Sequence, residues 1–253
     1  MTEKQLIAYR KEVENCILKI EPSKSSFKGF DLQHYIGTAF TVSGVKMPVA
    51  RKLSRDGFSF SHLEADEQYI IWKYIWHTTD NFDTMTQAIF FCDKYIRLAN
   101  PEFFFNEMCE WLQRVDNWAH SDSLTHYFAA LMESHPAMVY PVLQKWNKSD
   151  FSWERRQSVL SLLDYARFRK KYPTFNKIIA LVKPLLKDKD VFVQKGVGWC
   201  LRETGIIYPT ETYAFLVDNH AAISSIAFSA AAEKLSPAKK EKLKSLRKKS
   251  RKS

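Results

Sequence analysis

The strongest constraint on the fold is a nearly unbroken succession of segments with helical periodicity, separated by short stretches rich in Pro, Asn, Asp and Ser. Four prolines, Pro48, Pro101, Pro136 and Pro209, lie at predicted helix starts, where a missing N–H removes no intrahelical hydrogen bond. Only 7 glycines occur in 253 residues, which leaves little turn chemistry for a chain of short strands. The predicted helices span residues 2–19, 31–40, 48–56, 63–77, 82–98, 101–113, 119–134, 137–146, 151–165, 173–184, 190–204, 209–218 and 222–233.

The expected fold is therefore all-α. Consecutive helices with short connections form antiparallel pairs, and stacked pairs build an α-solenoid. Because no sequence repeat is visible, such an array has to be degenerate. The competing fold is a compact, irregular helical bundle.

The positive charge of the chain is concentrated at its C-terminus. Residues 239–253 hold nine Lys or Arg and one Glu, a net +8, so the remaining body accounts for about +2 of the total +10. We divide the chain into a repeat domain, residues 1–236, and a basic C-terminal tail, residues 237–253. The tail either attracts phosphates or is a solvated, frayed terminus, and Leu243 and Leu246 would also allow a short helix.

Several classes of protein are disfavoured by the sequence. The four cysteines are scattered without metal-ligand spacing, which predicts buried, reduced thiols and no zinc site or disulfide framework. The N-terminal segment is amphipathic and charged, so neither a signal peptide nor a membrane span is expected, and the predicted location is cytoplasmic. No cofactor is expected.

Segment 190–204 has an unusual polar face. Its apolar stripe consists of Val193, Val197, Cys200 and Leu201. The opposite face carries two aromatic residues and two cations, namely Phe192, Trp199, Lys195 and Arg202. This face either packs against another helix pair or contacts the sugars and phosphates of a nucleic acid.

Two further segments place functional residue types on helices. In 117–133, Trp118 and Asp122 are four residues apart and therefore neighbours, and the small Thr125 and Ala129 beside them suggest the floor of a shallow pocket. Asp122 would alternatively serve only the helix dipole. In 151–165, Arg156 lies within an apolar stripe, so its charge requires an anion, either an internal carboxylate or a DNA phosphate.

Taken in order, these segments resemble the AlkD-like HEAT-repeat family of DNA alkylation-repair glycosylases. The similarity runs from about residue 30 to residue 205. Its four parts are the segment from Tyr35 through Gly44, Lys46 and Pro48 to Arg51, the segment 116–122 with Trp118 and Asp122, the segment 153–156 ending in Arg156, and the segment 192–203 with Trp199. Many members have a second Trp before the motif Trp and an Asp directly after it, where this chain has Asn117 and Ala119. His120 is also a departure, with either a structural role or a phosphate contact.

The resemblance implies a right-handed superhelix of HEAT-like repeats that cradles duplex DNA, and a monomer. It implies that Tyr35, Trp118 and Trp199 contact the DNA backbone around the lesion, that Asp122 lies near the glycosidic bond, and that Arg156 supports the site. We count Asp122, Trp118, Arg156 and Trp199 as catalytic residues and Tyr35, Lys46, Arg51, Phe192, Lys195 and Arg202 as DNA-binding residues.

The expected activity is that of a monofunctional glycosylase acting on N3- or N7-alkylated purines in double-stranded DNA, without a deep base-flipping pocket. No lysine near Trp118 or Asp122 suggests a Schiff-base lyase, and the chemistry needs no metal. The main alternative is a non-catalytic HEAT-repeat protein that binds branched or damaged DNA. A protein-binding scaffold is the third possibility.

Overall fold

The computed structural model describes residues 1–20 and 30–250, and within them the chain forms fourteen α-helices and two short 3₁₀ helices. Apart from an isolated bridge between Thr41 and Asn81, the described residues contain no β-structure. The predicted all-α class is thus confirmed. The chain divides into two compact units, Met1–Leu124 and Thr125–Ser253.

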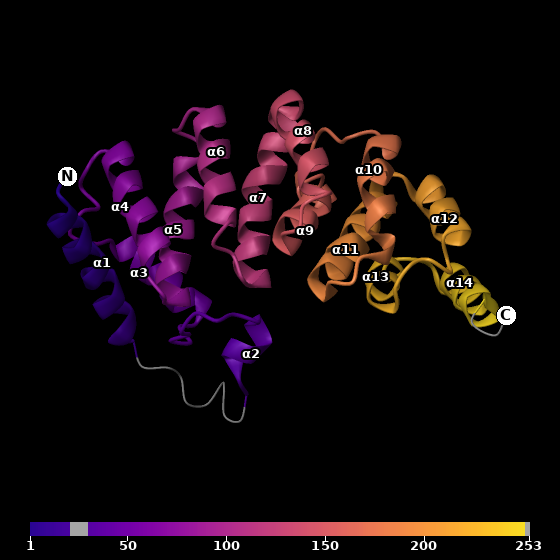
Figure 1. The fold of residues 1–253 in the computed structure, drawn as a ribbon, viewed down its shortest axis with the longest axis horizontal. Coiled ribbons are helices and arrows are strands. Elements are labelled where there is room, and N and C mark those ends of the chain that lie inside the picture. The colour runs from indigo at the N-terminus through magenta and orange to yellow at the C-terminus, as the bar shows by residue number, and fades with distance from the viewer. Residues whose placement is uncertain (21–29, 251–253) are drawn as a thin grey trace. The chain divides into compact units, whose positions relative to one another are not determined.

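The first unit consists of six helices and the beginning of a seventh, coloured indigo to magenta in Figure 1. These are α1 (Glu3–Leu18), α2 (Leu32–Ile36), α3 (Met47–Asp56), α4 (Ala65–Thr78), α5 (Phe82–Tyr95), α6 (Pro101–Leu112) and the first turns of α7 (Trp118–Ser134). Helix α5 packs against α1, α3 and α4. The interior is aromatic, and the fully buried rings of Trp76 and Trp111 stack with 4.6 Å between centroids.

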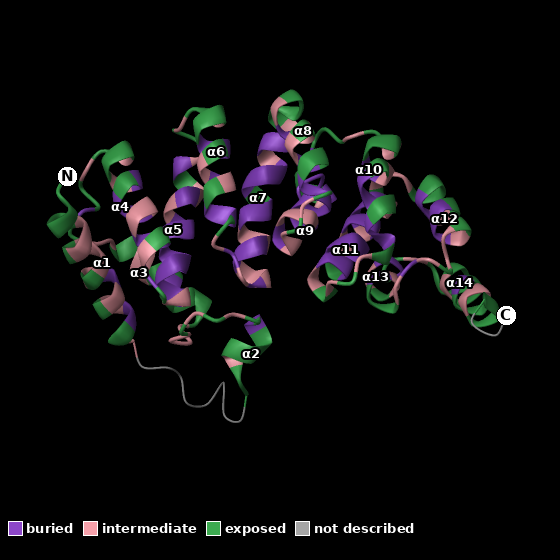
Figure 2. Cartoon of the chain, in the orientation of Figure 1, coloured by how far each residue is buried: buried purple, intermediate pink, exposed green. Residues whose placement is uncertain are grey.

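The second unit is built around one long helix, α11 (Val191–Ile207), which packs against helices on both sides of it in sequence. The other elements are the rest of α7, α8 (Pro136–Trp146), α9 (Ser152–Leu160), η1 (Ala166–Phe168), α10 (Phe175–Val182), η2 (Lys183–Lys187), α12 (Pro209–Asp218), α13 (Ser225–Ala231) and α14 (Pro237–Ser250). Figure 2 shows α11 buried along most of its length. Packing of a helix on others near it in sequence, as α11 packs on α9, α10, α12 and α13, is the arrangement expected of helical repeats.

Each of the thirteen predicted helices is present, and the four prolines lie in the first turn of α3, α6, α8 and α12. Several helices are shorter than predicted, α2 and α9 among them. Helix α2 ends at Ile36 because Gly37 adopts a φ of 75° and its N–H bonds back to the carbonyls of Gln33 and His34. Helix α9 ends at Leu160, and the chain turns at Asp164, which has a φ of 54°.

The basic C-terminal segment is helical over Pro237–Ser250, as its leucines allowed. Leu243 is fully buried, and the guanidinium of Arg247 donates to the backbone carbonyls of His220 and Ile223 beyond the end of α12. The interpretation of a frayed terminus is therefore wrong for residues 237–250. The last three residues of the predicted tail lie outside the described part of the chain.

The four cysteines are free thiols; Cys92 and Cys200 are buried as predicted, whereas Cys16 and Cys109 are half-buried. Burial raises the pKa of the Cys200 thiol to about 12, so the thiol stays protonated and unreactive. Within the described residues, no helix is both long enough and apolar enough to cross a membrane.

The contact between α11 and α13 depends on Gly198, because a Cβ at this position would lie 2.6 Å from the backbone oxygen of Ala227. We expect Gly198→Ala to lower the free energy of unfolding by about 1–3 kcal/mol through overpacking. Gly205→Ala in the same helix is the matched control, since its nearest neighbour atom would be 3.6 Å away. The control should be neutral or up to about 1 kcal/mol stabilising. Urea unfolding of both variants measures the difference. Equal stabilities would contradict the conclusion that the contact between α11 and α13 requires glycine at position 198.

Candidate nucleic-acid interface

The predicted site residues fall into one group in each unit. Tyr35, Lys46, Arg51, Trp118 and Asp122 belong to the first unit, and Arg156, Phe192, Lys195, Trp199 and Arg202 belong to the second.

Trp118, the first residue of α7, is fixed to Tyr35 by its only polar atom. The indole Nε1–H donates to the backbone carbonyl of Tyr35 at 3.0 Å, and the two rings meet edge to face with 5.6 Å between centroids. Tyr35 is 57% exposed and also contacts Phe30, at 5.2 Å between centroids. The structure therefore brings together two of the predicted DNA-contacting aromatics, with Trp118 half-buried.

Asp116 anchors the loop that follows α2, the helix that carries Tyr35. Its carboxylate accepts hydrogen bonds from the Thr38 hydroxyl and the Ala39 backbone N–H, both at 2.7 Å. Because Asp116 lies two residues before Trp118, the loop after α2 and the start of α7 are held by the same short segment. The sequence pattern assigns no role to Asp116, because its partners lie in a different part of the sequence.

The start of α7 is organised by Asn117 and His120. The Asn117 side chain accepts from the His120 backbone N–H at 2.9 Å, as a helix N-cap does, and its amide nitrogen lies 3.2 Å from His120 Nδ1. His120 Nε2 lies 3.2 Å from the hydroxyl of Thr86. An amide donor at Nδ1 assigns the remaining ring proton to Nε2, which donates to Thr86.

His120 is only 1% exposed, and its ring stacks on Phe82 with 4.3 Å between centroids. Burial lowers the pKa of His120 to about 3, so the ring is neutral near pH 7. A phosphate contact, one of the two roles considered for His120, is excluded by this position. Its role is structural: it braces the first turn of the helix that carries Trp118 and Asp122.

The low pKa of His120 makes the stability of the protein depend on pH. An unfolded histidine binds a proton below a pKa of about 6.5, whereas the folded ring resists protonation down to about pH 3. This contribution is fully present above about pH 6.5 and is lost as the pH falls, by up to about 1.4 kcal/mol per pH unit.

We therefore expect His120→Gln to reduce the pH dependence of the unfolding free energy between pH 6.5 and 4.5. The variant is less stable at neutral pH, but the slope is the quantity that tests the argument. His62→Gln, at an exposed position, is the control and should keep the wild-type slope. Identical slopes for wild type and His120→Gln, measured by urea unfolding, would show that His120 does not titrate as inferred.

Asp122 lies one helical turn beyond Trp118 on α7 and is partly exposed. The two small residues that follow it are interior: Thr125 is 2% and Ala129 is 1% exposed. Thr125 donates its hydroxyl proton to Gln157 Oε1 at 3.0 Å. The predicted shallow pocket floored by Thr125 and Ala129 is therefore wrong, because both side chains are interior and Thr125 bonds to α9.

Lys46 and Arg51 lie at the start and in the middle of α3, and both are exposed. The Arg51 guanidinium covers the Phe90 ring at 4.5 Å and lies 3.6 Å from the Asp93 carboxylate. The segment leading to Lys46 is held by Asp83, whose carboxylate accepts the backbone N–H groups of three consecutive residues at 2.7–3.2 Å. These residues are Ser43, Gly44 and Val45.

Arg156, on α9, is 3% exposed, as its place on an apolar stripe predicted. Its Nη1 donates to the backbone carbonyl of Phe192 at 2.6 Å, and the side chain runs against Gly196, where a Cβ would lie 3.2 Å from Arg156 Cγ. The glycine thus makes room for the arginine between α9 and α11. Phe192 itself stacks on Trp153, and the Lys195 ammonium lies over the Phe192 ring, 5.1 Å from its centroid.

Trp199 repeats the arrangement of Trp118. Its indole Nε1–H donates to the backbone carbonyl of Asp164 at 2.9 Å, and its ring lies 4.9 Å from that of Tyr165. The Arg202 guanidinium covers Trp199 at 5.2 Å and is paired with Glu203 and Glu233, each at 3.0 Å. The predicted division of α11 is confirmed: the apolar stripe is buried, and Trp199 is half-buried.

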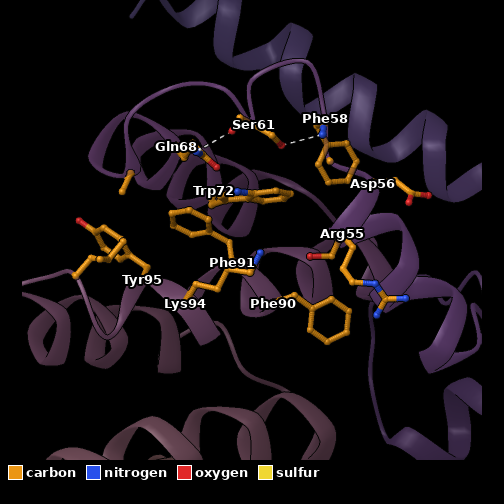
Figure 3. A pocket seen from close by; sticks show the side chains of 14 residues that line it. Arg55, Asp56, Phe58, Ser61, Gln68, Trp72, Phe90, Phe91, Lys94 and Tyr95 are labelled. Atoms are coloured by element: carbon orange, nitrogen blue, oxygen red, sulfur yellow. Dashed lines mark hydrogen bonds between the residues drawn. The ribbon is translucent and has the colours of Figure 1, made fainter.

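A separate cleft of about 370 Å³ lies in the first unit between the end of α3, α4 and α5. Figure 3 shows Phe58, Trp72 and Phe91 as its aromatic walls, with Arg55 and Lys94 among the labelled lining residues. None of the predicted site residues lines this cleft. Among the described residues, no group of three or more His, Cys, Asp or Glu side chains is placed to hold a metal ion.

The fold and the paired aromatic clusters define a helical-repeat protein with two tryptophans held by their indole nitrogens. The sequence matches the model of the family described as DNA alkylation repair enzyme over residues 19–235. The chain belongs to this family of DNA alkylation repair enzymes. A search of curated protein sequences gives no significant match.

Two solved structures share the fold. A predicted DNA alkylation repair enzyme from Enterococcus faecalis superposes with a TM-score of 0.69 at 15% identity, covering 87% of this chain and 99% of its own. The crystal structure of AlkD2 from Streptococcus mutans superposes with a TM-score of 0.55 at 16% identity, covering 96% of this chain and 98% of its own. At these identities the similarity establishes the fold.

Proposed function

We propose that this protein is a monofunctional DNA glycosylase that releases cationic N3- or N7-alkylated purines from double-stranded DNA. The observation that carries the proposal is the fixing of Trp118 and Trp199 by hydrogen bonds to backbone carbonyls. Because an indole has no other hydrogen-bonding atom, both residues have only their ring faces and edges to offer a ligand. An aromatic face stabilises a nearby cation, which is the charge that an alkylated nucleoside carries.

The chemistry needs little acid catalysis. A purine alkylated at N3 or N7 is positively charged, so the electron pair of the breaking bond between C1′ and the base nitrogen neutralises the leaving base. Positive charge develops instead on the deoxyribose, where an ionised Asp122 carboxylate would stabilise it. A water molecule then adds to C1′ and gives up one proton, which Asp122 would accept or direct to solvent.

The remaining site residues receive supporting roles in this proposal. Tyr35, Lys46 and Arg51 in the first unit, with Phe192 and Lys195 in the second, would contact sugars and phosphates. The buried Arg156 would act as a positioning residue, because it holds the backbone at Phe192 at the start of α11. Arg202 would act indirectly, by holding the Trp199 ring that it covers, because its guanidinium is already paired with two carboxylates.

We expect the wild-type protein to release N3-methyladenine and N7-methylguanine from methylated duplex DNA, as measured by chromatography of the free bases. A duplex that contains hypoxanthine, a neutral lesion, should remain intact, because no charge on the base assists its departure. Tight binding to DNA without release of any alkylated base would instead identify a non-catalytic DNA-binding protein.

Asp122→Asn tests the assignment of the carboxylate, because the substitution removes the charge and keeps the size. We expect the single-turnover rate of base release to fall by roughly 10²–10³-fold, the range found when one electrostatic stabiliser is removed. Affinity for the duplex should change little, since the interaction forms in the transition state.

The matched control is Glu110→Gln, which removes a negative charge from an exposed position on α6 in the same unit. This variant should release bases at the wild-type rate. A thermal melt of Asp122→Asn separates loss of chemistry from loss of folding. Wild-type rates in the well-folded Asp122→Asn variant would remove Asp122 from the mechanism.

A further inference from the structure

Residues 165–172, which we call the basic loop, form a charged surface. None of the predicted site residues lies in this segment. The sequence Tyr-Ala-Arg-Phe-Arg-Lys-Lys-Tyr contains four cations and no acidic residue. Arg167, Lys170 and Lys171 are exposed, and Phe168 is 55% and Tyr172 41% exposed. The Phe168 ring meets that of Tyr165 with 5.8 Å between centroids, and apolar surface that is clustered and rimmed by polar residues is typical of an interaction site.

The backbone of the basic loop is held in place by carboxylates from neighbouring helices. Glu133 of α7 accepts the backbone N–H groups of Lys170 and Lys171 at 2.7 and 3.1 Å, and Glu203 of α11 accepts that of Ala166 at 3.0 Å. The Tyr172 hydroxyl donates to the carbonyl of Arg169 at 2.9 Å. A loop fixed in this way loses little conformational entropy when it binds a partner.

The four cations of the loop have different surroundings. Arg169 is buried and interacts with Glu133 at 3.5 Å and Asp164 at 3.6 Å. By contrast, no described carboxylate lies within 4.0 Å of the side-chain nitrogens of Arg167, Lys170 or Lys171. Three positive charges of the basic loop are therefore available to an external anion.

The basic loop is continuous with Trp199. The Arg167 guanidinium covers Phe168 at 4.6 Å and Tyr165 at 5.3 Å, and the Tyr165 ring is 4.9 Å from Trp199. Asp164, which precedes the loop, supplies the carbonyl that fixes the Trp199 indole. A guanidinium stacked on rings keeps its N–H edge free for a bidentate contact with phosphate.

We propose that the basic loop binds the sugar-phosphate backbone of double-stranded DNA beside the segment that Trp199 contacts. Cations that neutralise phosphates, interleaved with aromatic faces that pack on sugars, form the chemistry of such a surface. The proposal rests on DNA being the ligand of the proposed function, and it adds a contact outside the predicted catalytic and DNA-binding residues.

The test compares two triple variants that each remove three positive charges. Arg167→Ala/Lys170→Ala/Lys171→Ala changes the basic loop, and Lys145→Ala/Lys148→Ala/Lys183→Ala changes exposed lysines elsewhere in the same unit. The affinity for an undamaged duplex is measured from 50 to 200 mM salt. We expect the loop variant to lower the slope of log affinity against log salt by roughly 2–3, since each lost phosphate contact contributes about 0.9.

The control variant should keep nearly the wild-type slope. Equal changes in both variants would mean that only net charge matters, and an unchanged loop variant would mean that the loop does not touch DNA; either result overturns the proposal. Loss of binding to phosphatidylserine vesicles in the loop variant, with unchanged DNA affinity, would overturn it in favour of a membrane surface.

Phe168→Ala examines the aromatic part of the loop without changing charge. We expect several-fold weaker duplex binding with an unchanged salt slope, whereas Ile206→Ala, at a similarly exposed apolar position of α11, should bind as wild type does. Thermal melts should be unchanged for both. Because these readouts need only binding, a wild-type protein that releases no alkylated base would defeat the proposed function and leave the basic loop testable.

Discussion

The structure depends on partners for the backbone groups that helices leave unpaired at their ends and in the loops between them. Carboxylates take the N–H groups: Asp83 holds three consecutive residues before Lys46, and Glu133 holds two in the basic loop. Arginines take the carbonyls, as Arg114 does at the end of α4 and Arg247 does beyond α12. The loops before Lys46 and beside Trp199 are therefore held by charged side chains from neighbouring helices.

The same constraint determines what the two tryptophans can do. Trp118 and Trp199 each donate their indole N–H to a backbone carbonyl, that of Tyr35 at the end of α2 and that of Asp164 in the turn after α9 respectively. This hydrogen bond orients each indole ring relative to the segment that accepts it and uses the only hydrogen-bond donor of the ring. In the proposed function, both residues would meet the DNA through their aromatic surfaces, which suits a mechanism based on stabilising positive charge and a contact with sugars.

Charge is divided in a related way between the interior and the surface. Arg156, Arg169 and Arg202 have side chains directed to internal carbonyls or carboxylates. Their planar guanidinium groups satisfy several acceptors at once, which lysine does not do. Arg167, Lys170 and Lys171 of the basic loop are exposed instead, and Arg167 stacks on its own aromatic neighbours. The net charge of +10 therefore overstates the positive surface at the candidate site.

The sequence by itself determined the helices and the buried side of α11, because spacing along the chain decides both. Val193, Val197 and Leu201 recur at helical intervals and are fully buried, and the prolines mark helix starts through a local steric rule. The W-x-x-x-D spacing likewise placed Trp118 and Asp122 one turn apart on α7. Only the tertiary structure decided which polar groups meet across helices. In the folded protein His120 is buried between Phe82 and Thr86, and Thr125 is buried as well. Arg202 pairs with Glu233, and Glu133 holds the backbone of the basic loop. These partners lie about 30 to 40 residues apart along the chain, and local periodicity carries no information on contacts at that separation.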